Sequence, residues 1–489
     1  ARTWIVGARP GAATARIAAR FGARPVVASE GIYVVDKRRA RVFAAHLGDR
    51  LTMAEPDALG AKRAMPTDPL TPAQWWYPAV VDPNLTPPPV TPQSPSLGII
   101  EEEIQRDHPD MQGVVSTGNG VPPDAHGTQV AGAAGAPDNE IGIVGIWPGM
   151  RIDMPVYRGV ACSTITASLN RAVARGASVV NMSYGFPRTT CFAHFVATQR
   201  AFARGVVLIA AGGNEFDEGN PLQRPAVDPH VVTVAALKQD LSSSDFSNEN
   251  AWIDISAPGT DVLLPTPPQF DEDGTRDGYQ AVDGTSFAAP IVAAVATWLR
   301  AAGPALRAGQ VNRILQDSAV DLGRRGWDQR FGYGKADMAR ALAALQTRVP
   351  AVDPLEPNDD AEWVNGRRLG RADPPIFGRA SRLIALDAAL ERFEDPFDVY
   401  RAVLPPRSTV RFTLVVRAGD PDLDLYSGGT RTVTGARGLL GSSTRGGRAT
   451  DVVTLRNNSR SARTVLVNPY TGGRAPRRAS YRLLVRRIA

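Results

Sequence analysis

One serine in this sequence stands where a nucleophile would be activated. The run 284–290 (GTSFAAP) places Ser286 among small residues and opens an apolar stretch that continues to Leu299. This pattern predicts a buried helix that begins near Ser286, with Pro290 in its first turn, where a missing N–H costs little. The positive end of a helix and its free N–H groups stabilise an oxyanion, so Ser286 suits acyl-transfer chemistry.

A histidine upstream supplies the base that such a nucleophile needs. His126 opens the run 126–132 (HGTQVAG), whose small residues let a helix pack closely against its neighbours. A serine hydroxyl is a weak nucleophile until an adjacent base takes its proton. The two runs together therefore predict hydrolysis by a serine–histidine pair.

These two runs and three later segments, all in the same order, resemble the subtilisin-like serine proteases. The later segments are 179–185 (VVNMSYG), 208–214 (LIAAGGN) and 247–259, which contains SN and IDISAPG. The resemblance covers roughly residues 68–345 and implies serine endopeptidase activity. It implies Ser286 as nucleophile, His126 as general base and then acid, and Asn214 as a side-chain donor to the oxyanion.

The resemblance also implies how a peptide is held. A peptide substrate would pair as an additional strand with the segment that holds it. Hydrogen bonds between the two backbones would give affinity, and pockets for the substrate's side chains would give selectivity. The residues that the resemblance assigns to substrate binding are Ser183, Tyr184, Gly185 and Gly213.

The carboxylate that should orient the histidine departs from the family pattern. The family has an apolar strand followed by Asp-(Ser/Thr)-Gly and then His-Pro-Asp. Here the strand is 97–100 and the landmark is 108–110, so the aspartate position falls on Glu101, followed by Glu102 and Glu103. Glutamate can accept from the histidine N–H, as in Ser-His-Glu triads, but its side chain is one methylene longer.

A structural calcium ion and a disulfide are further implications of the resemblance. Residues 136–143 resemble the family's calcium loop and imply Asn139 and Asp110 as ligands; a calcium-free turn of the same shape is the alternative. Cys162 and Cys191 follow two predicted neighbouring strands, in loops that flank the substrate groove in the family. We favour a disulfide between them over two separate packing cysteines. No cofactor is required for the chemistry.

Length and composition set the broad class. The 489 residues allow about three domains, and the hydrophobic content of 43% supports globular cores. We expect no membrane span, because no apolar stretch reaches the ~18 residues that a spanning helix requires. The net charge is +6, and the chain beyond Arg431 is rich in arginine. No nucleic-acid-binding motif accompanies these arginines. The positive charge therefore predicts a solvated surface, with loose attraction to anionic polymers as the alternative.

The chain reads as an α/β protein with an added all-β part. The expected segments are a βαββαβ propeptide-like domain (1–57), a linker with the extended start of the mature enzyme (58–95), a subtilisin-like parallel-sheet peptidase domain (96–348), a linker (349–360) and a C-terminal β-sandwich (361–489). The first resembles an inhibitory propeptide. The last resembles the bacterial pre-peptidase C-terminal domain, whose acids here are turn formers or calcium ligands.

The sequence therefore predicts a secreted, monomeric serine endopeptidase made as a zymogen that cuts itself between Pro56 and Asp68. Its partners would be protein or peptide substrates and its own propeptide as an intramolecular inhibitor, with no specific nucleic acid. The alternative is a catalytically impaired subtilase-fold binding protein; the presence of serine, histidine and asparagine together favours the enzyme. The other histidines lack ligand-like spacing and are predicted to be structural or exposed: His46, His108, His194 and His230.

Overall fold

The chain forms two compact units, Ala1–Ala64 and Met65–Ala489. This computed structural model describes residues 3–56, 66–114, 124–347, 349–350, 355–361, 374–472 and 477–488. The segment 57–65, which holds most of the predicted self-cleavage region, lies outside the described residues, as do residues 351–354 of the second predicted linker.

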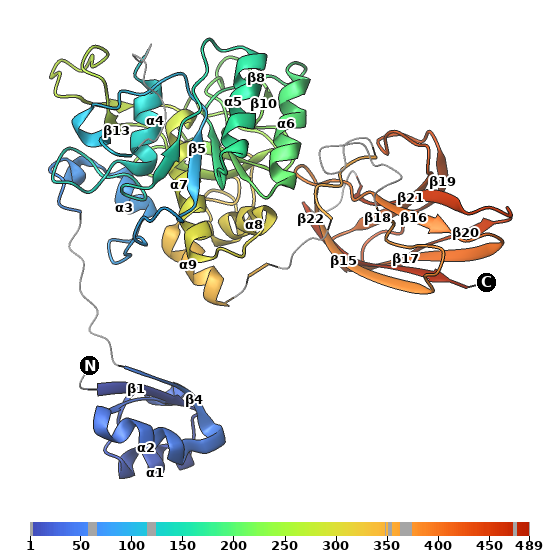
Figure 1. Ribbon diagram of the computed structural model, residues 1–489, viewed down its shortest axis with the longest axis horizontal. Helices are drawn as coiled ribbons and strands as arrows, with labels where there is room; N and C mark the ends of the chain where they lie inside the picture. The colour runs from blue at the N-terminus through green and yellow to red at the C-terminus, as the bar shows by residue number, and fades with distance from the viewer. Residues whose placement is uncertain are drawn as a thin grey trace. The chain divides into compact units, whose positions relative to one another are not determined.

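The N-terminal unit has the predicted order of strands and helices. Its elements are β1 (Thr3–Ala8), α1 (Ala12–Arg20), β2 (Arg24–Val27), β3 (Ile32–Asp36), α2 (Lys37–Leu47) and β4 (Leu51–Pro56). The strands form an antiparallel sheet in the order β2-β3-β1-β4, and both helices pack on one face of it (Figure 1). Phe43 and Leu47 of α2 meet Val6 and Val35 of the sheet in a small core of their own.

A six-stranded parallel sheet organises the larger unit. Its strands are β5 (Ser96–Ile99), β6 (Arg151–Asp153), β7 (Val179–Met182), β9 (Val207–Ala211), β11 (Val231–Leu237) and β12 (Ile253–Pro258), in the order β12-β11-β9-β7-β5-β6. β5, β7, β9, β11 and β12 are almost entirely buried, as expected for parallel strands covered on both faces. This confirms the predicted parallel-sheet fold of the peptidase part.

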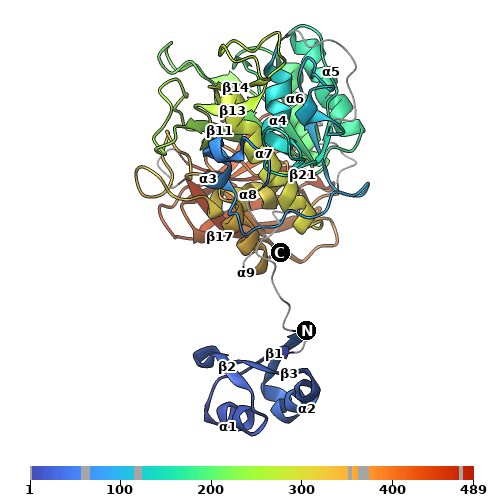
Figure 2. The ribbon, with the colours of Figure 1, turned by 90° about the vertical axis from the view of Figure 1, so that its left-hand side faces the viewer.

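Helices connect and cover these strands. They are α4 (His126–Gly135), α5 (Cys162–Ala174), α6 (Phe192–Ala203), α7 (Thr285–Ala302), α8 (Ala308–Ser318) and α9 (Met338–Thr347). α7 packs against β7, β9, β11 and β12, and α4 lies beside it (Figure 2). Smaller sheets pair β8 (Phe186–Pro187) with β10 (Gln223–Arg224) and β13 (Val262–Pro265) with β14 (Tyr279–Val282).

α7 differs from its sequence-based expectation in two ways. It is 18 residues long and apolar enough to cross a membrane by length and composition, but 78% of it is buried inside the protein, as in the core helix of a globular domain. Pro290 was expected in the first turn, and this is wrong: the helix begins at Thr285, so Pro290 lies inside it. A proline there cannot donate to the carbonyl four residues earlier, which belongs to Ser286.

The segment before β5 is more ordered than its low periodicity predicts. It contains a short helix, α3 (Trp76–Val80), and Trp76 is fully buried in the main core. The Trp76 indole N–H donates to the carbonyl of Leu263, which ties this segment to β13.

The C-terminal part of the larger unit consists of two four-stranded antiparallel sheets. One has the order β15-β22-β17-β20 and the other β16-β21-β18-β19. Their bounds are β15 (Leu383–Glu391), β16 (Tyr400–Leu404), β17 (Ser408–Ala418), β18 (Pro421–Ser427), β19 (Leu439–Ser443), β20 (Asp451–Asn457), β21 (Arg463–Thr471) and β22 (Arg478–Arg487). Alternate residues face a core shared by both sheets, which includes Phe412, Leu425 and Leu483.

Candidate active site

Two predicted catalytic residues and one predicted substrate-binding residue follow three neighbouring strands of the parallel sheet. Glu101 comes shortly after β5, Ser183 directly after β7 and Asn214 shortly after β9, and these strands are adjacent in the order β9-β7-β5. Parallel strands end at the same edge of a sheet, where open α/β folds place their ligands. The fold therefore gathers these residues on one edge.

Glu101 and His126 are in direct contact. His126 Nδ1 lies 3.1 Å from Glu101 Oε2, and the Glu101 side chain is 5% exposed against 31% for His126. A carboxylate at Nδ1 holds the imidazole in the tautomer that leaves Nε2 unprotonated and ready to accept a proton.

The segment after β5 packs tightly on the first turn of α4. A Cβ at Gly127 would lie 2.1 Å from the carbonyl oxygen of Glu103, so only glycine permits this approach. The backbone N–H of Gln105 donates to Thr128 Oγ1 over 3.0 Å. Glu102 points elsewhere and accepts from the N–H of Gly159 at 2.6 Å. These contacts set the distance at which the longer glutamate side chain reaches the imidazole.

Two opposing effects act on the His126 imidazole. Burial is the largest single effect and disfavours the cation, whereas the charge of Glu101, its hydrogen bond to the ring and the charge of Asp124 together favour it. The net effect raises the pKa of His126 above its ordinary value. Asp124 also accepts from the His126 backbone N–H at 2.9 Å, at the start of α4.

Ser286 is the second residue of α7, and its neighbour Phe287 faces the histidine. The ring of Phe287, its neighbour in the chain, is 5.6 Å from the His126 ring. Ser183 Oγ donates to the Ser286 carbonyl at 2.8 Å, and that carbonyl is the one to which Pro290 cannot donate. Because of this proline, the Ser286 carbonyl lacks its helical donor, and Ser183 of the predicted substrate-binding segment donates to it instead.

The side chain of Asn214 is oriented by Thr285. Its Oδ1 accepts from both the backbone N–H and the Oγ1 of Thr285, at 2.9 and 2.7 Å. The remaining NH₂ group lies 3.5 Å from the position of a Cβ on Gly284, beside the start of α7. Gly213 has a φ of 104°, which side chains rarely adopt, and its N–H donates to Thr285 Oγ1. These bonds hold the Asn214 side chain in one orientation and leave its NH₂ group beside the start of α7.

The predicted substrate segment has a buried support. Tyr184 Oη lies 2.8 Å from Nε2 of His194, which is fully buried. Burial, with a smaller effect of Arg224, lowers the pKa of His194 to about 4, so this histidine is neutral at ordinary pH. Gly185 is exposed and free to face a ligand, although a side chain there would collide with Gln223.

The predicted calcium ligands lie together with a third residue, Asp68. Asp68 Oδ1 accepts from the backbone N–H groups of Asn139 and Glu140, at 2.9 and 2.6 Å. Asp110 Oδ2 accepts from Ile143 N–H at 2.8 Å. One oxygen of each aspartate has no hydrogen-bond partner among the described residues. Burial raises the pKa of Asp110 to about 8, and it also raises that of Asp68.

The predicted disulfide is present. Cys162 and Cys191 are bonded, with their Cα atoms 5.5 Å apart. The bond joins the start of α5 to the residue that precedes α6, so it links the two loops that follow β6 and β7.

Some residues that shape the site were not found from the sequence. Thr285 and Asp124 act through short hydrogen bonds to Asn214 and His126, and a threonine or aspartate at a helix start is usually only a cap. Asp68 lies 71 residues from Asn139 in the sequence, so local spacing gave no signal for their contact.

Comparison with known proteins agrees with this geometry. The profile of the Subtilase family matches residues 93–334. Subtilisin DY of Bacillus licheniformis is 32% identical over 256 residues, which is 49% of this chain and 86% of that protein. The minor extracellular protease Epr of Bacillus subtilis is 33% identical over 277 residues; the match covers 51% of this chain but only 41% of Epr.

A solved structure extends the likeness in fold. The crystal structure of fervidolysin from Fervidobacterium pennivorans aligns with a TM-score of 0.52 and 17% identity, over 92% of this chain and 84% of that one. From the shared parallel sheet and the identity to subtilisin DY along most of its length, the chain belongs to the subtilase family and is a subtilisin-like serine endopeptidase.

Proposed function

We propose that this chain is a secreted endopeptidase that hydrolyses peptide bonds through a Ser286–His126–Glu101 triad. The observation that carries the proposal is the 3.1 Å contact between His126 Nδ1 and Glu101 Oε2, at the position where the family has aspartate. Glutamate takes the orienting role in triads of other folds, so the chemistry does not require the shorter side chain.

The proposed reaction uses these groups in turn. Ser286 Oγ attacks the peptide carbonyl carbon while His126 Nε2 takes the hydroxyl proton, and Glu101 stabilises the resulting imidazolium. The negative oxygen accepts from the Asn214 side chain and the Ser286 N–H. The intermediate collapses to an acyl-serine as His126 gives the proton to the leaving amine. Water then repeats the steps in the deacylation half, releasing the acid and restoring Ser286.

We further propose that the enzyme is made as a zymogen and leaves the cell. In support, the small βαββαβ unit directly precedes the peptidase part, where a self-inhibiting propeptide would lie. The relative Epr is named an extracellular protease, and the Cys162–Cys191 disulfide fits an oxidising compartment. The two C-terminal sheets fit a pre-peptidase C-terminal β-sandwich, and the enzyme would act as a monomer on protein or peptide substrates.

A structural calcium ion fits the cluster of Asp68, Asp110 and Asn139. The two aspartates are nearly fully buried, and each has a carboxylate oxygen without a hydrogen-bond partner among the described residues. Calcium binds mixtures of carboxylate, amide and backbone oxygens. These residues would hold the ion away from the catalytic groups, where it adds stability and takes no part in the reaction.

Self-processing tests the proposal. The parent chain expressed in a protease-free host should be shortened by cleavage between Pro56 and Asp68, whereas Ser286→Ala should stay at full length. Ser242→Ala changes an exposed serine outside the site and should be processed like the parent. The mass of each purified product gives the answer. Equal processing of Ser286→Ala would contradict the assigned nucleophile, and an unprocessed, inactive parent would favour a binding protein.

A further inference from the structure

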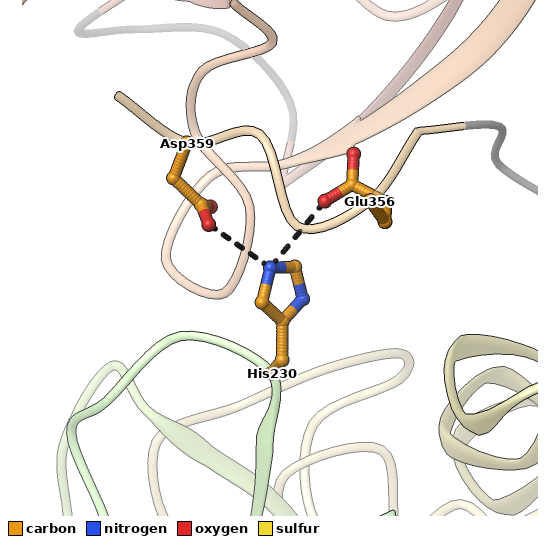
Figure 3. Close-up of side chains that lie close together, drawn as sticks. All are labelled: His230, Glu356 and Asp359. Carbon is orange, nitrogen blue, oxygen red and sulfur yellow. Dashed lines mark hydrogen bonds and ion pairs between the residues drawn. The ribbon is translucent and has the colours of Figure 1, made fainter. Parts of the chain in front are cut away.

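His230, Glu356 and Asp359 converge at the edge of the sheet opposite the active site. His230 immediately precedes β11, whereas the catalytic residues follow the strands, and the two acids lie in the segment that leads to the C-terminal sheets. His230 Nε2 lies 3.1 Å from Asp359 Oδ2 and 3.4 Å from Glu356 Oε2 (Figure 3). Figure 3 shows both carboxylates turned toward the same ring nitrogen.

The imidazole of His230 is held in place before any ion binds. Its ring stacks on Phe202, with centroids 4.1 Å apart and planes 2° from parallel. Asn312 Nδ2 donates to the His230 carbonyl at 3.2 Å, and the side chain is 7% exposed. A ligand whose rotamer is already fixed by packing loses little entropy on binding a metal.

The spacing of the three ligand atoms suits a small divalent cation. They all lie within 4.8 Å of one another. Ligands at the ~2.0–2.1 Å distance typical of zinc, placed at the corners of a tetrahedron, are roughly 3.3 Å apart. The observed separations from His230 Nε2, 3.1 and 3.4 Å, bracket that value.

A further buried carboxylate, which accepts from the Tyr481 hydroxyl, adjoins Glu356 of this cluster. Asp398 is fully buried, and its Oδ1 has no hydrogen-bond partner among the described residues. Its carboxylate lies within 4.8 Å of those of Glu356 and Asp395.

The donor set indicates the class of ion. An imidazole nitrogen with two carboxylate oxygens suits zinc and similar transition metals, whereas calcium takes oxygen ligands almost exclusively. His230 and Glu356 also line a cavity of about 530 Å³, which gives an ion a path to the cluster.

We propose that a zinc-class divalent cation binds to His230, Glu356 and Asp359 and joins the C-terminal sheets to the peptidase part. The site lies apart from the catalytic residues and acts on stability. It goes beyond the proposed proteolysis and does not depend on it.

The test uses the full chain carrying Ser286→Ala, which cannot digest itself. After removal of metal with a chelator, zinc chloride is titrated in by calorimetry, and thermal melting is recorded with and without zinc. We expect about one equivalent bound at this site and a rise in Tm, as binding to the folded state alone requires. His230→Gln and Asp359→Asn should each weaken zinc binding at least ~100-fold and abolish the rise in Tm.

Asp387→Asn is the matched control, because Asp387 is an exposed carboxylate of the C-terminal sheets that pairs with Arg482. It should bind zinc like the parent. Zinc binding that is absent from the parent, or unchanged in both ligand variants, would overturn the proposal. A calcium-specific site that His230→Gln leaves intact would also overturn it, because the ion would then belong to the acids alone. If His230→Gln lowers Tm equally with and without zinc, the cluster stabilises the fold as an ion pair only, and the proposal is wrong.

Discussion

Ser183 Oγ donates a 2.8 Å hydrogen bond to the carbonyl oxygen of Ser286. The bond connects the residue that follows β7 to the proposed nucleophile, at a carbonyl to which Pro290 cannot donate. Asn181 Nδ2 in turn donates to Ser183 Oγ at 2.9 Å. The substrate-binding segment and the start of α7 are therefore fixed relative to each other.

Loss of this bond should weaken catalysis moderately. A net contribution of about 0.5–1.5 kcal/mol per hydrogen bond corresponds to a fall of roughly 2- to 10-fold in kcat/KM for Ser183→Ala. Steady-state kinetics with one peptide substrate measure it, and Ser242→Ala serves as the control. If Ser183→Ala has the kinetics of the parent, the bond does not position the nucleophile.

Thr285 should matter for catalysis through Asn214. Asn214→Ala removes the oxyanion donor and should lower kcat by ~10²–10³, with little change in KM. Thr285→Val keeps the shape but removes the hydroxyl that holds Asn214 Oδ1 at 2.7 Å, so we expect a smaller loss, about 10-fold. A Thr285→Val enzyme with full kcat would show that Asn214 is oriented by other groups.

The pH dependence of kcat/KM should report the contact between His126 and Glu101. The base must be neutral to accept a proton, so activity rises with pH through the pKa of His126. The Glu101 carboxylate raises that pKa, which places the acidic limb above the ordinary value of about 6.5. Glu101→Gln removes the charge and should move the limb to lower pH, whatever the remaining rate. A limb that stays in place would contradict the contact.

Arg477 should stabilise the larger unit most at alkaline pH. It pairs with Glu391, lies 3.8 Å from Asp254, a fully buried residue of β12, and stacks on Trp327 at 4.0 Å. Burial raises the pKa of Asp254 to about 7, and Arg477 opposes that rise. The folded state therefore holds a proton that the unfolded state releases above about pH 4, and stability falls as pH rises from there to about 7.

Arg477→Met should therefore cost about 3 kcal/mol more at pH 8, where the buried Asp254 charge loses this arginine, than near pH 5, where Asp254 can be protonated; the loss of the Glu391 pair adds to the cost. Denaturant unfolding at both pH values measures the difference. Adding Asp254→Asn should recover much of the loss at pH 8, and Arg482→Met, at an exposed pair, should change little. An equal loss at pH 5 and pH 8 would show that the arginine acts through packing alone.

Local patterns predicted the elements that position the chemistry. His126 and Ser286 each stand at the start of a helix and are followed by small residues, and the strands before Glu101, Ser183 and Asn214 are short and mostly apolar. Each of these patterns spans only a few neighbouring residues, so it can be recognised in the sequence without knowledge of the fold.

The features that the sequence did not predict depend on contacts between residues that are far apart in the sequence. Trp76 lies in a segment without periodicity, and its helix is held by burial against the main core. His230 was predicted to be structural or exposed, and its contact with Asp359 joins residues 129 positions apart. Pro290 was misplaced because no local residue marks whether α7 begins before or after Ser286.

The glutamates after β5 offer the most direct test of the triad. Kinetics of Glu101→Gln, Glu102→Gln and Glu103→Gln with one peptide substrate rank their roles, and Glu101→Asp tests the need for the longer side chain. We predict a fall of ~10²–10⁴ in kcat for Glu101→Gln with unchanged folding, partial activity for Glu101→Asp, and much smaller effects for the other two. Near-normal kcat in Glu101→Gln, or a large loss confined to Glu102→Gln or Glu103→Gln, would contradict the Ser286–His126–Glu101 triad.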